Sequence, residues 1–145
     1  MFNNILVVCV GNICRSPVGE ILLRETLPNN FNISSAGIAA LTGKPIDPTS
    51  AELLTENGID SSAHIAQQLN SDLISKNDLI LVMEKGHIDA ICSRYPSARG
   101  KVQLLGRWQG DVEIPDPYRQ QRPAFEHAYK LIAQGVADWA KKLGC

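Results

Sequence analysis

The feature that most constrains the fold is a short, unbroken apolar run near the N-terminus, residues 5–8 (Ile-Leu-Val-Val). A half-buried strand alternates apolar and polar residues, whereas a run without polar residues is typical of a strand buried on both faces, as in a parallel sheet. Strands of such a sheet are joined by right-handed crossovers, usually through helices. The run therefore predicts an α/β fold with helices flanking a parallel sheet.

The rest of the chain continues the alternation of strands and helices. Further strands are expected at residues 31–36, 78–83 and 101–105. Helices are expected after Ser16-Pro17, after Asp47-Pro48, around 69–74, around 88–91 and from Pro123 onward, the last with an apolar stripe of Phe125, Tyr129, Ile132, Val136, Trp139 and Leu143. Because no repeat or linker interrupts the pattern, residues 1–145 are expected to form a single three-layer domain around a four-stranded parallel sheet.

Composition limits the classes of partner. The 145 residues carry 14 basic and 15 acidic side chains, for a formal charge of -1. A nucleic-acid-binding protein normally has a basic surplus or stripe, which is absent here. No segment approaches the ~20 apolar residues of a membrane span. The cysteines, Cys9, Cys14, Cys92 and Cys145, are too few for a secreted disulfide scaffold, so free thiols in a reducing cytoplasm are expected.

A thiol, a guanidinium and a helix start meet in residues 9–17 (Cys-Val-Gly-Asn-Ile-Cys-Arg-Ser-Pro). Ser16 is expected to cap the helix, and Pro17 suits its first turn. If residues 10–15 turn back toward the helix, their backbone N–H groups can form a nest for an anion, aided by the positive end of the helix. Gly11 permits a positive φ and Asn12 tolerates one.

The same segment predicts phosphate chemistry. The planar fork of Arg15 matches two oxygens of a phosphate. The positive surroundings also favour a thiolate at Cys9, to which Ser16 can donate its hydroxyl. We therefore predict a phosphate-binding loop after the first strand, with Cys9 as nucleophile. The alternative is a buried structural Cys9 with Arg15 on the surface.

A proton donor is predicted in residues 114–118 (Ile-Pro-Asp-Pro-Tyr). The prolines stiffen the loop and hold the carboxyl of Asp116 at its tip. A carboxyl beside a bound dianion keeps its proton more readily, because like charge disfavours ionisation. Asp116 can then protonate a leaving oxygen and afterwards activate water. The alternative is an ordinary turn, because spacing alone does not bring Asp116 to Cys9.

The combination of C-V-G-N-I-C-R-S-P with a distal D-P-Y resembles the low-molecular-weight protein tyrosine phosphatases. The likeness runs along the whole chain and includes Ser35-Ala36-Gly37, while Met83-Glu84-Lys85 resembles the bacterial branch linked to exopolysaccharide and capsule export. Those enzymes act beside autophosphorylating tyrosine kinases. The resemblance therefore implies a cytoplasmic, monomeric phosphatase that needs no cofactor and whose partner is a phosphotyrosine protein such as that kinase.

The resemblance also implies residue roles. Cys9 matches the nucleophile, Arg15 the phosphate clamp and Asp116 the general acid. The implied substrate-binding residues are Val10, Gly11, Asn12, Ile13, Cys14, Ser16, Leu41 and Tyr118. Leu41 departs from the aromatic residue of eukaryotic relatives, and Gly19 stands where alanine is usual. For Cys14 the resemblance implies a redox partner of Cys9, and simple packing under the loop is the alternative.

Three alternatives concern other chemistries. A metal site is not expected, because His64, His87 and His127 show no ligand spacing with the cysteines and are taken as surface or helix residues. A thioredoxin-coupled arsenate reductase uses a similar loop, but it needs a second cysteine pair where this chain has Met83 and Cys92. A non-catalytic phosphoprotein-binding module would require neither a thiolate nor an acid.

Overall fold

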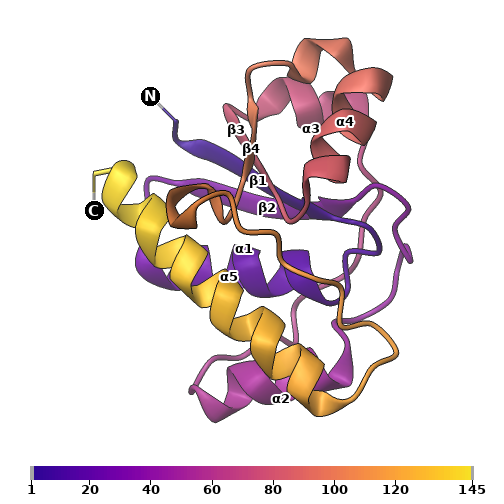
Figure 1. The fold of residues 1–145 in the computed structure, drawn as a ribbon, viewed down its shortest axis with the longest axis vertical. Coiled ribbons are helices and arrows are strands. Elements are labelled where there is room, and N and C mark those ends of the chain that lie inside the picture. Colours follow the sequence, from indigo (N-terminus) through magenta and orange to yellow (C-terminus); the bar gives the residue numbers. More distant parts are fainter. Residues whose placement is uncertain (1, 145) are drawn as a thin grey trace.

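Four parallel strands form the centre of the protein, in the order β2-β1-β3-β4 (Figure 1). The computed structural model describes residues 2–144, so Cys145 lies outside it. Strand β1 (Asn4–Cys9) pairs with β2 (Asn32–Gly37) on one side and with β3 (Leu79–Val82) on the other, and β3 pairs with β4 (Val102–Leu104). Because all strands run the same way, their carboxyl ends share one edge, and Cys9 lies on it.

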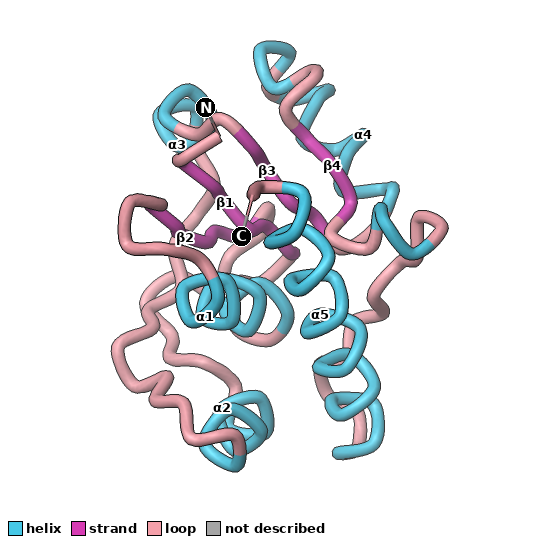
Figure 2. The backbone as a smooth tube through the Cα atoms, turned by 90° about the vertical axis from the view of Figure 1, so that its left-hand side faces the viewer, coloured by secondary structure: helices cyan, strands magenta, loops and turns pink. Residues whose placement is uncertain are grey.

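Helices cover both faces of the sheet, as Figure 2 shows. On one side are α1 (Arg15–Thr26), α2 (Pro48–Glu56) and α5 (Arg122–Lys142), and on the other α3 (Ser71–Lys76) and α4 (Lys85–Arg94). Two single-turn 3-10 helices, Pro96–Ala98 and Arg107–Gln109, were not expected from the sequence. The predicted three-layer α/β arrangement is confirmed.

The apolar run of β1 contributes to both layers of the core. Ile5 and Val7 pack toward α1 and α5, whereas Leu6 and Val8 pack on the side of α3 and α4, and all four are fully buried. This confirms that the run is a strand buried on both faces. Of the predicted stripe, Phe125, Ile132, Val136 and Trp139 on α5 are buried. Tyr129 and Leu143, the residue after the helix, are partly buried against the core.

Gly19, the departure noted in the first helix, lies where α1 crosses β1. A Cβ added there would lie 3.0 Å from Cγ1 of Val7 and 3.7 Å from the terminal carbon of Met83. Glycine therefore lets α1 sit close to the sheet at a tight contact. The helix expected after Asp47-Pro48 is α2, and Asp47 caps it by accepting a hydrogen bond from the backbone N–H of Thr49 at 2.9 Å.

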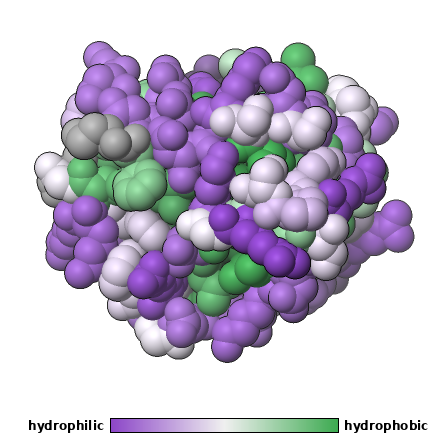
Figure 3. Space-filling model, turned by 90° about the horizontal axis from the view of Figure 1, so that it is seen from above, coloured by the Kyte–Doolittle hydropathy of each residue, from purple (hydrophilic) through white to green (hydrophobic). Residues whose placement is uncertain are grey.

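The face in Figure 3 is largely hydrophilic, with separate small hydrophobic areas. Among residues 2–144, no helix is both long and apolar enough to cross a membrane. Of the large apolar side chains that are exposed, Val10, Leu41 and Tyr118 line one pocket, whereas Phe2, Ile65 and Trp108 lie outside it.

Candidate active site

A pocket of about 140 Å³ opens at the carboxyl end of β1. It brings together Cys9, Arg15 and Asp116 with Val10, Gly11, Ile13, Cys14, Ala39, Leu41 and Tyr118. All three predicted catalytic residues and six of the eight predicted substrate-binding residues therefore line one space. Asn12 and Ser16, the other two, are fully buried beside it. Ala39 was missed by sequence reasoning, since a small apolar residue in a loop carries no chemical signal.

The Cys9 thiol faces the first turn of α1. Its Sγ lies 2.9 Å from the Ser16 hydroxyl oxygen and 3.4 Å from the Ser16 backbone nitrogen, which donates to it. The expectation that Ser16 caps the helix is wrong: α1 begins at Arg15, and its capping position is Cys14, whose side chain makes no capping bond. The serine hydroxyl is directed at the sulfur instead, and the helix N-terminus favours negative charge there.

The buried side chain of Asn12 holds the loop in place through hydrogen bonds. The Asn12 φ of 61° lies in the left-handed region, as predicted, whereas Gly11 is not among the described residues with a positive φ. The Asn12 amide donates to the hydroxyls of Ser16 at 2.7 Å and Ser35 at 3.0 Å, and its carbonyl Oδ1 accepts from the backbone N–H of Gln67 at 2.9 Å. Because the Ser16 oxygen already accepts from Asn12, its own proton is available for the Cys9 sulfur.

Of the histidines expected on the surface or on helices, His87 does lie on a helix but is buried, whereas His64 lies in a loop. His64 Nε2 lies 2.7 Å from the backbone oxygen of Asn12, so this side chain braces the loop. His87 lies on α4, is 8% exposed, and has a buried Nδ1 without a hydrogen-bond partner. Burial, together with the charge of Arg15, lowers the pKa of His87, so its ring stays neutral more readily. Within residues 2–144 no cluster of ligand side chains suits a metal ion.

Arg15 is buried, not on the surface. Its side chain is 2% exposed, and Nη1 donates to the backbone oxygen of Ile114 at 2.8 Å and to the carboxylate of Glu84. Its Nη2 lies 3.7 Å from Oδ2 of Asp116. Glu84 is a contact that sequence reasoning missed, although Met83-Glu84-Lys85 was noted as a mark of the bacterial branch. The alternative of a surface arginine beside a structural cysteine is therefore wrong.

Asp116 reaches the pocket on an exposed loop. Its side chain is 44% exposed, and its Oδ1 accepts from the backbone N–H of Tyr118 at 3.1 Å. The guanidinium carbon of Arg119 lies 5.2 Å from the centre of the Tyr118 ring, which is itself 38% exposed. The structure thus brings Asp116 to the same pocket as Cys9, which spacing alone did not predict.

Cys14 lies in the same loop but in different surroundings. Burial raises the pKa of its thiol well above the usual range, and the nearby charges of Asp47 and Asp116 act in the same direction. The thiol therefore stays protonated at neutral pH. Cys9, Cys14 and Cys92 are free thiols in this structure, and the redox pairing of Cys14 with Cys9 stays a prediction.

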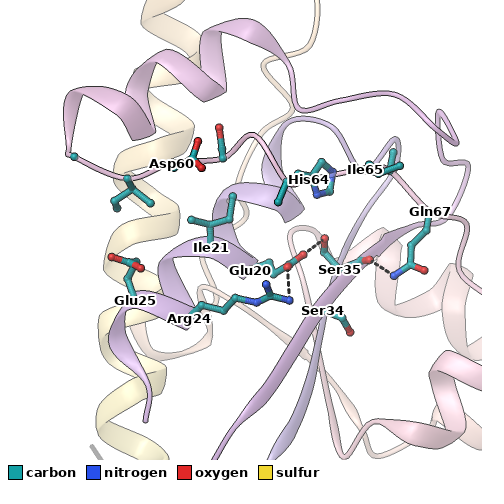
Figure 4. Close-up of a pocket in the computed structure, with 15 residues that line it drawn as sticks. Glu20, Ile21, Arg24, Glu25, Ser34, Ser35, Asp60, His64, Ile65 and Gln67 are labelled. Atoms are coloured by element: carbon teal, nitrogen blue, oxygen red, sulfur yellow. Dashed lines mark hydrogen bonds and ion pairs between the residues drawn. The ribbon is translucent and has the colours of Figure 1, made fainter. Parts of the chain in front are cut away.

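A second, larger hollow lies behind the loop and has no thiol in its lining (Figure 4). It has a volume of about 670 Å³ and lies between α1, β2 and the segment 58–67. Ser35, which lines it, links Glu20 to Asn12: its hydroxyl donates to Glu20 at 2.5 Å and accepts from Asn12 at 3.0 Å. The hollow therefore lies beside the residues that hold Asn12 in place, and not beside the side of the loop that carries the Cys9 thiol.

Comparison with known proteins decides the family. Residues 4–144 match the family described as low molecular weight phosphotyrosine protein phosphatase. The chain belongs to this family. The predicted enzyme class, a protein-tyrosine-phosphatase, is thereby confirmed.

Several bacterial proteins are similar to the chain. The chain is 48% identical to the low molecular weight protein-tyrosine-phosphatase Wzb of Escherichia coli K12, over 99% of this chain and 97% of the relative. Among solved structures, Vibrio vulnificus Wzb in complex with benzylphosphonate is 55% identical, with a TM-score of 0.94, over 98% and 99% of the two chains. The YwlE arginine phosphatase from Geobacillus stearothermophilus is 32% identical, with a TM-score of 0.91, over 97% and 92%. The predicted bacterial branch is therefore confirmed.

Proposed function

We propose that the protein hydrolyses phosphotyrosine in proteins through a cysteinyl-phosphate on Cys9. The observation that carries the proposal is the shared pocket of Cys9, Arg15 and Asp116. A thiol beside a loop predicted to bind anions, a guanidinium and a carboxyl supply the nucleophile, the clamp and the acid that the reaction needs. Phosphoryl transfer asks a protein mainly for positioning and charge stabilisation, which these groups provide.

In the first step, the Cys9 thiolate attacks phosphorus in line with the tyrosine oxygen. The S–P bond forms as the P–O bond to the phenol breaks, and the Asp116 carboxyl gives its proton to the phenolic oxygen. The backbone N–H groups of residues 10–15 and the Arg15 guanidinium hold the phosphoryl oxygens. The Ser16 hydroxyl, 2.9 Å from the sulfur, stabilises the thiolate before attack.

In the second step, water attacks the phosphorus of the cysteinyl-phosphate. The Asp116 carboxylate takes a proton from that water, the S–P bond breaks, and Cys9 leaves as a thiolate. Inorganic phosphate is released and Asp116 is again protonated. The Ser16 hydroxyl now stabilises the departing sulfur.

The pocket walls support an aromatic substrate. Ile13, Leu41 and Tyr118 are apolar or aromatic and flank the loop, so they suit the ring of phosphotyrosine better than the charged guanidinium of phosphoarginine. The arginine phosphatase YwlE shares the fold at 32% identity, so phosphoarginine is the substrate to test against. We expect an arginine-phosphorylated peptide to be turned over at least about 100-fold more slowly than a phosphotyrosine peptide.

For the partner, we propose an autophosphorylating tyrosine kinase of capsule or exopolysaccharide export, dephosphorylated in the cytoplasm by a monomeric enzyme. The likeness to the bacterial branch supports this choice. The test is substrate trapping with Cys9→Ser and Asp116→Ala in the native cell. Recovery of a tyrosine-phosphorylated kinase supports the proposal, and its absence from both trapping variants contradicts it.

The function is tested by hydrolysis of p-nitrophenyl phosphate in the presence of chelator. Wild type should release nitrophenol, and Cys9→Ser should lower the rate by at least about 10⁴-fold because the nucleophile is removed. Cys92→Ser is the matched control, since Cys92 lies on α4 away from the pocket, and it should keep the wild-type rate. A folded wild type that binds phosphate without turnover would contradict the proposal and leave an anion receptor or arsenate chemistry.

A further inference from the structure

The Arg15 guanidinium makes its hydrogen bonds to the protein from one side only, while Nη2 forms a longer ion pair with Asp116 at 3.7 Å. Both protein oxygens that it hydrogen-bonds, the backbone oxygen of Ile114 and the carboxylate of Glu84, are reached by Nη1. Among the described residues, none accepts a hydrogen bond from Nε. A guanidinium recognises phosphate through a pair of parallel N–H groups on one edge, so the edge formed by Nε and Nη2 remains available.

The available edge lies on the pocket side. Nη2 is 3.7 Å from Oδ2 of Asp116, which lines the pocket with Cys9. The two acceptors on Nη1 are therefore the groups that determine which edge of the fork meets the phosphate. The two acceptors differ in charge. Ile114, two residues before Asp116, accepts through a neutral backbone carbonyl, whereas Glu84 accepts through a carboxylate. A charge-assisted hydrogen bond of this kind is about twice as strong as a neutral one.

The sheet fixes the position of Glu84. It follows β3 by two residues and occupies the capping position of α4, and β3 pairs in register with β1. The carboxylate thus stands at a set distance from the loop that follows β1. We propose that Glu84 is a positioning residue, which holds Nη1 of Arg15 so that the Nε–Nη2 edge faces the phosphoryl group; this inference rests on the proposed function.

The alternative is that Glu84 weakens phosphate binding, and this alternative makes an equally clear prediction. If Glu84 competed with phosphate for Arg15, or repelled the dianion by its charge, its removal would tighten phosphate binding. If Glu84 positions Arg15, its removal weakens phosphate binding and slows turnover together, because the fork is used by both the bound phosphate and the transition state. The sign of the change in phosphate affinity separates the two roles.

The test compares Glu84→Ala, Glu84→Gln and the control Asp89→Asn. Asp89 is an exposed carboxylate on the same helix. We expect Glu84→Ala to raise the inhibition constant of inorganic phosphate by about 5-fold or more and to lower kcat/KM for p-nitrophenyl phosphate by about 10- to 100-fold. Glu84→Gln, which keeps an acceptor oxygen, should recover part of both losses, and Asp89→Asn should match wild type in both.

A purely structural role is excluded by two further readouts. The thermal unfolding midpoint of Glu84→Gln should equal that of wild type, since the side chain is 37% exposed. In an Arg15→Lys background, which has no fork to orient, Glu84→Ala should change the remaining turnover by less than about 2-fold. An unchanged or lowered phosphate inhibition constant in both Glu84 variants, or an undiminished effect of Glu84→Ala in the Arg15→Lys background, would overturn the inference.

Failure of this inference differs from failure of the proposed function. If the function fails, wild type itself releases no nitrophenol, and phosphate affinity measured by calorimetry still compares the Glu84 variants. If only the inference fails, wild type turns over and the Glu84 variants match it in rate and in phosphate affinity.

Discussion

Two loops meet at the pocket, and each contains a residue other than glycine in the left-handed backbone region. Asn12 in the phosphate loop, residues 10–15, has a φ of 61°, and Arg119 in the acid loop, residues 113–121, has a φ of 64°. Their surroundings differ completely. Asn12 is fully buried and hydrogen-bonded to Ser16, Ser35, Gln67 and His64, whereas Arg119 is exposed and lies over the Tyr118 ring.

The difference in burial and hydrogen bonding indicates that the two loops have different roles. The phosphate loop is held by residues from β2 and from the segment 64–67, so we expect its backbone conformation to be the same before and after substrate binds. The acid loop is tied to the body mainly near Ile114, whose N–H donates to the Met83 oxygen at 2.9 Å and whose oxygen accepts from Arg15. Under the proposed function, we expect the buried loop to hold phosphate in a fixed position and the more exposed loop to place the proton donor.

The largest effect is expected from a substitution that removes the proton donor of the acid loop and leaves the phosphate loop intact. Asp116→Asn should lower kcat/KM for phenyl phosphate, which reports the first step alone, by about 10²- to 10⁴-fold, because the phenolate then leaves without a proton. The loss should be smaller for p-nitrophenyl phosphate, whose leaving group needs less protonation. Steady-state kinetics on the two esters checks this. An equal loss on both would mean that Asp116 does not protonate the leaving oxygen.

The next largest effect is expected from a substitution that removes the hydrogen bonds holding the phosphate loop. Asn12→Ala should lower the free energy of unfolding by about 3 kcal/mol, because buried partners of the amide lose their hydrogen bonds and alanine disfavours a positive φ. Urea unfolding measures this, and kcat/KM should fall with it. A loss below about 1 kcal/mol would show that Asn12 does not brace the loop.

A smaller effect concerns pH and the buried His87 beside Glu84. Because burial lowers its pKa in the folded state, the unfolded chain binds the proton more readily as pH falls. The stability contributed by the neutral ring is therefore present above about pH 6.5 and is lost as pH falls through the lowered pKa. Unfolding free energies measured from about pH 7.5 to about pH 5 should fall less steeply in His87→Gln than in wild type. Parallel curves would contradict this.

The smallest effect is expected at Arg119. Arg119→Gly relieves the left-handed backbone but increases the entropy of the unfolded chain, so the unfolding free energy should change by less than about 1 kcal/mol. The same urea unfolding checks it. A loss as large as that of Asn12→Ala would remove the distinction between the two loops.

The sequence predicted the parts that depend on local pattern. The unbroken run of residues 5–8 predicted a strand buried on both faces, and Cys9, Asn12 and Arg15 lie in the loop that follows it because strand, loop and helix are consecutive. The residues that hydrogen-bond to Asn12 were not predictable, since His64 and Gln67 lie far from Asn12 in the sequence and come close to it only in the folded chain. Glu84 was missed for the same reason, because a single glutamate after a strand shows no partner until β3 lies beside β1.

The most direct test of the account is to find the phosphoryl group on Cys9. Wild-type enzyme mixed with p-nitrophenyl phosphate is quenched in acid within the first turnover, digested and measured by mass spectrometry. The account predicts one added phosphoryl group on the peptide that contains Cys9, lost on longer incubation and absent in Cys9→Ser. A turning-over enzyme whose Cys9 peptide is never phosphorylated, or whose phosphoryl group lies on another residue, would contradict it.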